Sequence, residues 1–197
     1  MKHLNLLISL LFVTTLGCLF TSCEETTEVD EYTTQWEERN IEYIKSIAQE
    51  AKTNADGKWI RILSYKLDSI DINGTYIEHD VEDYIYCHIE KQGEGTDHPL
   101  SLVSVNYRGR LIPTKSHPEG KVFDESYKGV LDPAINVPVE FSLNGLVKGW
   151  ITALIHMTKG ATWRVYIPAN LGYGGSSKTD IPAYSTLIFD INLMDFE

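Results

Sequence analysis

A glycine-rich stretch late in the chain has the length of a phosphate-binding loop. In "GYGGSSKT", Gly172 and the pair Lys178–Thr179 stand at the spacing of a G-x-x-x-x-G-K-[ST] motif. Ser177 occupies the place of the second glycine, however, and the following "DIPAYSTLIFDI" predicts a strand where a phosphate loop needs the N-terminus of a helix. We therefore do not interpret this stretch as a phosphate site.

Metal binding and covalent catalysis find no support in the residue pattern either. The chain has no G-x-S-x-G motif, and Cys87 lies inside the alternating run "YIYCHIE", where we expect a buried small hydrophobic residue. No pairing of the H-x-x-x-H kind occurs among the histidines, which are His3, His79, His88, His98, His117 and His156. We expect no metal and no cofactor. A net charge of −11 without a basic run also predicts no nucleic-acid partner.

Aromatic residues next to glycines, prolines and turns are the more informative feature. They predict an apolar cavity with loops as its rim, although the same residues could simply fill a core. The set is Tyr107, Phe123, Phe141, Trp150, Tyr173 and Phe189.

The elements that must position these side chains are mostly strands. The range 146–157 predicts a short helix, because Trp150, Leu154 and Met157 recur at helical spacing. An antiparallel sheet needs one face covered, so we expect an α+β fold of five or six strands with this helix across one face. The strand-like runs are 58–70, 83–92, 100–111, 138–143, 161–168 and 185–196.

An amphipathic helix is expected before the sheet, over 34–52. Thr34 and Glu37 have the spacing of a capping box, and "TNADG" is a stop signal. The helix must pack on something, either on the sheet of its own chain or on a second copy in a homodimer.

The first residues resemble a bacterial lipoprotein signal. An apolar run from Leu4 to Phe20 ends in "LFTSC", which predicts a signal peptide over 1–22, a lipidated Cys23 and an acidic tether over 23–33. We expect a lipid-anchored protein of the bacterial cell envelope, at the outer membrane. An ordinary signal peptide with a chance cysteine is the alternative, and Cys18 is a weaker candidate for the lipid.

Several motifs in fixed order resemble FKBP-type peptidyl-prolyl isomerases. They are "VSVNYRGRL", "KVFDES", "PVEFSLNGLVKGWITALIHMTKGATWRVYIPANLGYG" and "IPAYSTLIFDINL". The resemblance covers 80–197 and leaves 34–79 as an N-terminal helix and strand extension. It implies a half-open antiparallel sheet wrapped around one short helix, in agreement with the pattern of strands.

The resemblance also implies which residues form the pocket. The expected catalytic residues are Tyr107, Phe123, Asp124, Trp150, Tyr173 and Phe189. The expected substrate-binding residues are Leu146, Val147, Ile181, whose backbone N–H would hold the peptide, and Val139, which stands where the family has an aromatic residue. Gly149 is expected to let a ligand ring approach Trp150.

Two departures from the family pattern border this pocket. The segments 111–123 and 125–137 are longer than usual, and the second lacks the arginine that often partners the aspartate corresponding to Asp124.

The implied activity is cis–trans isomerisation of X-Pro bonds in envelope or exported proteins, with macrolides as inhibitors. The alternative is a catalytically weak or inactive binding or chaperone module, and the sequence alone leaves both open.

Overall fold

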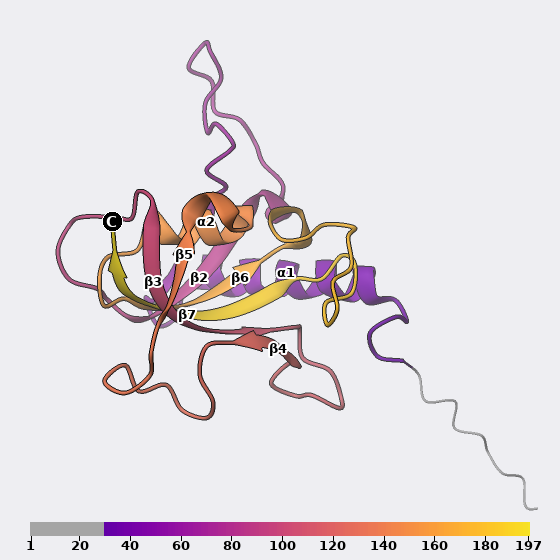
Figure 1. Ribbon diagram of the computed structural model, residues 1–197. Coiled ribbons are helices and arrows are strands. Elements are labelled where there is room, and N and C mark those ends of the chain that lie inside the picture. The colour runs from indigo at the N-terminus through magenta and orange to yellow at the C-terminus, as the bar shows by residue number, and fades with distance from the viewer. Residues whose placement is uncertain (1–29) are drawn as a thin grey trace, which may run out of the picture.

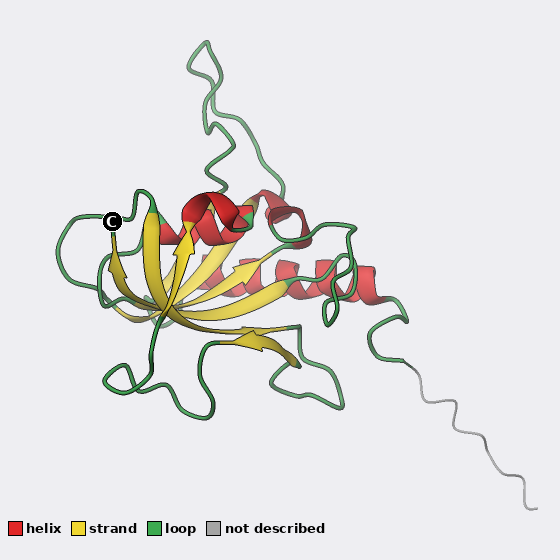
Figure 2. Ribbon diagram, in the orientation of Figure 1, coloured by secondary structure: helices red, strands yellow, loops and turns green. Residues whose placement is uncertain are grey.

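The computed structural model describes residues 30–197, which form an antiparallel sheet with a helix on each face (Figures 1 and 2). The signal peptide, Cys18, Cys23 and the start of the tether lie outside the described residues. The elements in chain order are α1 (Trp36–Thr53), β1 (Trp59–Leu63), the 3₁₀ turn η1 (Val81–Asp83), β2 (Tyr84–Lys91), β3 (Leu102–Arg110), β4 (Val122–Glu125), β5 (Val139–Ser142), η2 (Leu143–Gly145), α2 (Lys148–Leu154), β6 (Thr162–Ile167), η3 (Ala169–Leu171) and β7 (Leu187–Phe196).

Strand order confirms the predicted class and corrects the strand count. The described residues form a seven-stranded sheet in the order β1-β2-β6-β7-β3-β4, and β5 pairs with β3. The six expected runs correspond to six of these strands. The additional one, β4, has only four residues, too few for a readable alternation. The run expected over 58–70 ends as a strand at Leu63.

Strand β2 shows how the sheet buries both of its faces. Ile85 and Cys87 belong to the core that includes α2, whereas Tyr84 and Tyr86 belong to a second cluster beside α1. Successive side chains of a strand point to opposite faces, so α1 and α2 lie on opposite sides of the sheet. Cys87 is fully buried, as expected. Burial raises the pKa of its thiol, so the reactive thiolate is disfavoured and the side chain serves as a packing residue.

Helix α1 packs on the sheet of its own chain. Its Ile44 and Ile47 are buried among residues on the sheet face opposite α2, namely Tyr84, Tyr86, Tyr166 and Ile188. This docking is one of the two arrangements that the sequence left open. None of the helices in residues 30–197 has the length and apolar character that crossing a membrane requires.

The ends of α1 test the two predicted signals. At its N-terminus the expected capping box is wrong, because the N-cap residue is Gln35 in the left-handed region (φ 50°) and no side chain caps the helix. Thr34 is instead part of a preceding turn, in which its N–H donates to Asp30 O. At the C-terminus, the stop signal is confirmed, since Asn54 adopts the left-handed conformation and its N–H donates to Glu50 O at 2.8 Å.

Buried hydrogen bonds fasten the first turn of α1 to the chain just before β7. Trp36 Nε1 donates to Ser185 Oγ at 2.9 Å. Asn40 Oδ1 accepts the N–H of Thr186 at 2.7 Å, and Asn40 Nδ2 donates to Trp36 O at 2.6 Å. Because these groups are buried, each bond replaces one that water made in the unfolded chain. The helix therefore holds the segment that leads from the candidate site into β7.

We expect Asn40→Ala to destabilise the protein by about 1–3 kcal/mol, because the N–H of Thr186 would be buried without an acceptor. Urea denaturation measures the loss. Gln49→Ala, at an exposed position of the same helix, is the matched control and should change stability by less than about 0.5 kcal/mol. Equal losses in the two variants would show that helix propensity matters here and the buried bond does not.

Candidate functional site

A cavity of about 260 Å³ opens on the α2 side of the sheet. Its walls come from strands β3, β4, β5 and β7, from the junction before α2 and from the loop after η3. The lining residues are Tyr107, Asp124, Phe141, Gly145, Leu146, Val147, Trp150, Tyr173 and Phe189. The cavity is mostly aromatic, and Asp124 is its one charged residue.

Trp150, in the first turn of α2, lies at the centre of the aromatic contacts. Its ring centroid is 5.5 Å from that of Tyr107, 6.0 Å from Phe141 and 5.0 Å from Phe189. All three pairs are edge-to-face, the arrangement that ring quadrupoles favour. Trp150 is only 4% exposed, so three neighbouring rings fix its orientation and the cavity keeps its shape when empty.

Two glycines allow this packing, and one of them corrects an expectation. A Cβ atom on Gly149 would lie 2.4 Å from Ile167 Cγ2. Gly149 is therefore required for the close approach of α2 to β6, and the idea that it admits a ligand ring is wrong. On β3, a Cβ atom on Gly109 would lie 2.6 Å from both Phe123 Cε2 and Phe189 Cε1. Gly109 thus lets the two phenylalanine rings meet above the strand.

Asp124 has a hydrogen-bond partner inside the cavity despite the missing arginine. The hydroxyl of Tyr107 donates to Asp124 Oδ2 at 2.8 Å. Burial and this hydrogen bond raise the pKa of Tyr107, so the phenol stays protonated and remains a donor at neutral pH. The carboxylate is held by a neutral group, which leaves its negative charge uncompensated at the cavity wall.

An arginine next to this pair orders the lengthened segment 125–137. Arg108 Nε donates to Glu125 Oε2 at 2.8 Å, and its Nη2 donates to the carbonyl oxygen of Gly129 at 2.8 Å. Its guanidinium also lies 4.6 Å from the ring centroid of Tyr127. The extra residues are thereby fastened to β3 beside the cavity.

The structure brings together most of the residues expected at the site. Seven of the ten line the cavity, and Phe123 packs behind Phe189 at a centroid distance of 5.4 Å. Ile181 and Val139 do not line it. The N–H of Ile181 donates to Lys178 O within a tight turn, so it is not free for a peptide as expected.

Phe141 is the lining residue missing from the expected pocket set. It lies two residues after Val139, on the same face of β5, and its ring meets Tyr107 and Trp150. The sequence did indicate this role, because Phe141 is one of the six aromatic residues next to glycines, prolines and turns from which an apolar cavity was predicted.

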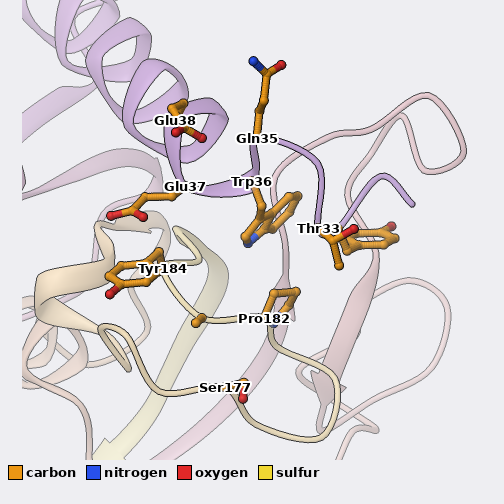
Figure 3. Close-up of a pocket in the computed structure, with 10 residues that line it drawn as sticks. Thr33, Gln35, Trp36, Glu37, Glu38, Ser177, Pro182 and Tyr184 are labelled. Carbon is orange, nitrogen blue, oxygen red and sulfur yellow. The ribbon is translucent and has the colours of Figure 1, made fainter. Parts of the chain in front are cut away.

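A larger cavity, of about 590 Å³, lies between the start of α1 and the chain before β7 (Figure 3). Figure 3 shows Trp36 directed toward the segment that carries Pro182, while Gln35 points away from it. Glu37 and Glu38 are the charged residues that line it, and no histidine, lysine or arginine lies among its lining residues. Within residues 30–197, no group of three or more His, Cys, Asp or Glu side chains is placed to hold a metal ion.

An antiparallel sheet wrapped around α2, with an aromatic cavity floored by Trp150, defines the class of protein. A family model for FKBP-type peptidyl-prolyl cis-trans isomerases matches residues 93–194. The chain belongs to this family.

Particular relatives support the same conclusion. The chain is 39% identical over 106 residues to the FKBP-type 22 kDa peptidyl-prolyl cis-trans isomerase of Escherichia coli, and this match covers 53% of the chain and 46% of the relative. It is 41% identical over 104 residues to the peptidyl-prolyl cis-trans isomerase Mip of Coxiella burnetii, covering 52% of the chain and 40% of the relative. The chain thus matches less than half the length of these two relatives.

A solved structure extends the likeness beyond the matched domain. The crystal structure of a peptidyl-prolyl cis-trans isomerase from Pseudomonas syringae superposes with a TM-score of 0.51 at 25% identity. The superposition covers 80% of this chain and 93% of that one.

We expect Gly109→Ala to displace the rings of Phe123 and Phe189, because the new methyl group would overlap both. Overpacking of this kind costs about 1–3 kcal/mol. Gly145→Ala is the matched control in the same cavity wall, since a Cβ atom there meets nothing within 4 Å. Denaturant midpoints and near-ultraviolet circular dichroism compare the two. An unchanged aromatic signal in Gly109→Ala would contradict the close approach.

Proposed function

We propose that the protein catalyses cis–trans isomerisation of X-Pro peptide bonds in the cavity floored by Trp150. The observation that carries the proposal is the rigid aromatic cavity, found at the position where the family resemblance implies the pocket. Tyr107, Phe123, Asp124, Tyr173 and Phe189 complete the proposed catalytic set, and Leu146 and Val147 contact the proline ring.

Isomerisation requires no nucleophile and no metal, which agrees with a site built from aromatic rings. Rotation about the peptide bond must overcome about 18–20 kcal/mol of amide resonance. The planar amide is more dipolar than the twisted transition state, so an apolar cavity disfavours the ground state relative to the transition state. A thousandfold acceleration needs only about 4 kcal/mol.

The polar atoms of the cavity orient the peptide. The hydroxyl of Tyr173 lines the cavity and donates to a carbonyl oxygen of the peptide. Asp124, already hydrogen-bonded to Tyr107, accepts from an N–H group of the substrate. The proposed substrates are proline-containing polypeptides, and macrolide inhibitors would fill the same cavity.

A second candidate function is binding without turnover. Three aliphatic side chains of the segment 125–137 are almost fully exposed beside β5: Val130, Ile135 and Val137. Exposed apolar side chains next to a peptide site favour contact with unfolded polypeptides, as in a chaperone module. We assign both functions to residues 80–197 and treat 34–79 as the extension that supports them.

Trp150→Leu should lower kcat/KM for an X-Pro peptide by about tenfold or more, because the floor of the cavity is lost. We expect a cost of about 1–3 kcal/mol in stability. Trp59→Leu, which removes a ring stacked on Tyr166 on the opposite face of the sheet, is the control and should keep the wild-type kcat/KM. A wild-type protein that binds proline peptides without accelerating isomerisation would favour the binding module.

We also propose that Cys23 carries a lipid that anchors the protein in the bacterial cell envelope, at the outer membrane. The support is the "LFTSC" motif after an apolar run. Cys23→Ser should move the protein from the detergent-requiring membrane fraction to the soluble fraction of the cell. Cys18→Ser is the matched control and should leave it in the membrane. Retention of Cys23→Ser in the membrane would exclude this anchor.

A further inference from the structure

The segment between β1 and η1, residues 64–80, projects from the domain as a long loop, here called the arm (Figures 1 and 2). Its two sides are joined by the bonds Ile77 N–H to Ser69 O (3.0 Å) and Asp71 N–H to Thr75 O (2.8 Å). At the turn, Asp71 Oδ1 also accepts the N–H groups of Asn73 and Thr75. The arm is therefore a hydrogen-bonded hairpin with a defined tip.

The tip of the arm is apolar and largely exposed. Ile72 is 100% exposed, Tyr76 67% and Ile70 56%. Large apolar side chains gathered at one exposed point are typical of an interaction surface. The arm is also acidic, because Lys66 is opposed by Asp68, Asp71, Glu78 and Asp80. Its binding partner should therefore be apolar and basic.

A cavity of about 520 Å³ at the base of the arm has this character. It lies between the second half of α1, strand β1 and η1. Its apolar lining residues are Ala48, Ala51, Val81 and Tyr86, and its charged ones are Lys45, Lys52 and Arg61. The absence of any acidic lining residue is notable in a chain whose net charge is −11. This basic groove favours an occupant that is both anionic and apolar.

We propose that two copies of the chain associate by placing the arm of each in the basic groove of the other. Val81 follows the arm directly and Arg61 lies in the strand that precedes it, so the groove and the base of the arm coincide. Two arms lying side by side and antiparallel about a two-fold axis bring each tip to the partner's groove. One symmetry operation thus forms both contacts, as an isologous interface requires.

A second copy fits the groove better than two other occupants. The arm cannot reach the groove of its own chain, because its tip points away from its base (Figure 1). The acidic residues 24–29 of the same chain carry charge but only one aliphatic side chain, that of Val29. The apolar face of α1 is already covered by its own sheet, so this dimer differs from one formed through that face.

Sedimentation equilibrium on the chain from Glu24 onward, which keeps every described residue, measures the association. The interface is small and charged, so we expect a dissociation constant of about 1–100 µM that weakens as salt is raised. Ile72→Ser with Tyr76→Ser should weaken dimerisation at least about tenfold without destabilising the fold, because both side chains are exposed.

Charge reversal provides the decisive comparison. A groove variant (Lys45→Glu, Lys52→Glu) and an arm variant (Asp68→Lys, Glu78→Lys) should each be monomeric, since arm and groove then carry like charge. Mixed together they should form a heterodimer, because both of its contacts pair opposite charges again. Lys115→Glu, at an exposed position outside the groove, should leave dimerisation unchanged.

Other outcomes overturn the proposal. A wild-type chain that remains monomeric up to about 200 µM excludes this dimer. Dimers that persist in all variants place the interface elsewhere, and loss of self-association in the groove variant without recovery on mixing points to the segment 24–29 as the occupant. Isomerase activity is measured in parallel and should not change, so failure of this proposal is distinct from failure of the proposed function.

Discussion

The close approach of α2 to the sheet is the constraint on which the site depends. It is possible only because Gly149 presents no side chain to Ile167, and it places Trp150 at the centre of three aromatic rings. A helix of seven residues has little stability of its own, so it is helical because it is packed here. The cavity is consequently a product of the core. The same contacts that stabilise the domain fix the geometry of its floor.

The opposite face of the sheet contributes by a different means. Helix α1 covers it with apolar contacts, but the first turn of the helix adds buried hydrogen bonds to Ser185 and Thr186. These residues directly precede β7, the strand that carries Phe189 in the cavity wall. The N-terminal extension therefore stabilises a strand of the candidate site. Its packing explains why β2 is buried on both sides although the sheet is antiparallel, where one solvated face is common.

The sequence predicted long-range architecture better than local detail. Alternation and helical spacing located six strands and both helices, because burial imposes those periods over many residues. Strand β4 escaped notice since four residues show no period. The capping box at Thr34 is not formed, because the N–H of Thr34 already donates to Asp30 O in a preceding turn. The hydrogen bond of the Ile181 N–H to Lys178 O likewise depends on a turn that the sequence pattern did not indicate. The role of Gly149 was misinterpreted because Ile167, the residue on β6 that it faces, is distant in sequence. Such errors arise where tertiary contacts decide local geometry.

Charge divides the molecule in a way that the fold alone does not require. On the α2 side, the sheet carries an aromatic cavity with one carboxylate, Asp124. On the α1 side, three basic residues gather in a chain whose net charge is −11. A cavity of low polarity suits an uncharged peptide group, and its opening must stay accessible to the polypeptide that carries this group. A surface that recognises a folded, acidic hairpin gains selectivity from fixed positive charge and needs little exposed apolar area. Because the two surfaces lie on opposite faces of one sheet, a peptide in the cavity and a partner's arm in the basic groove do not compete for space.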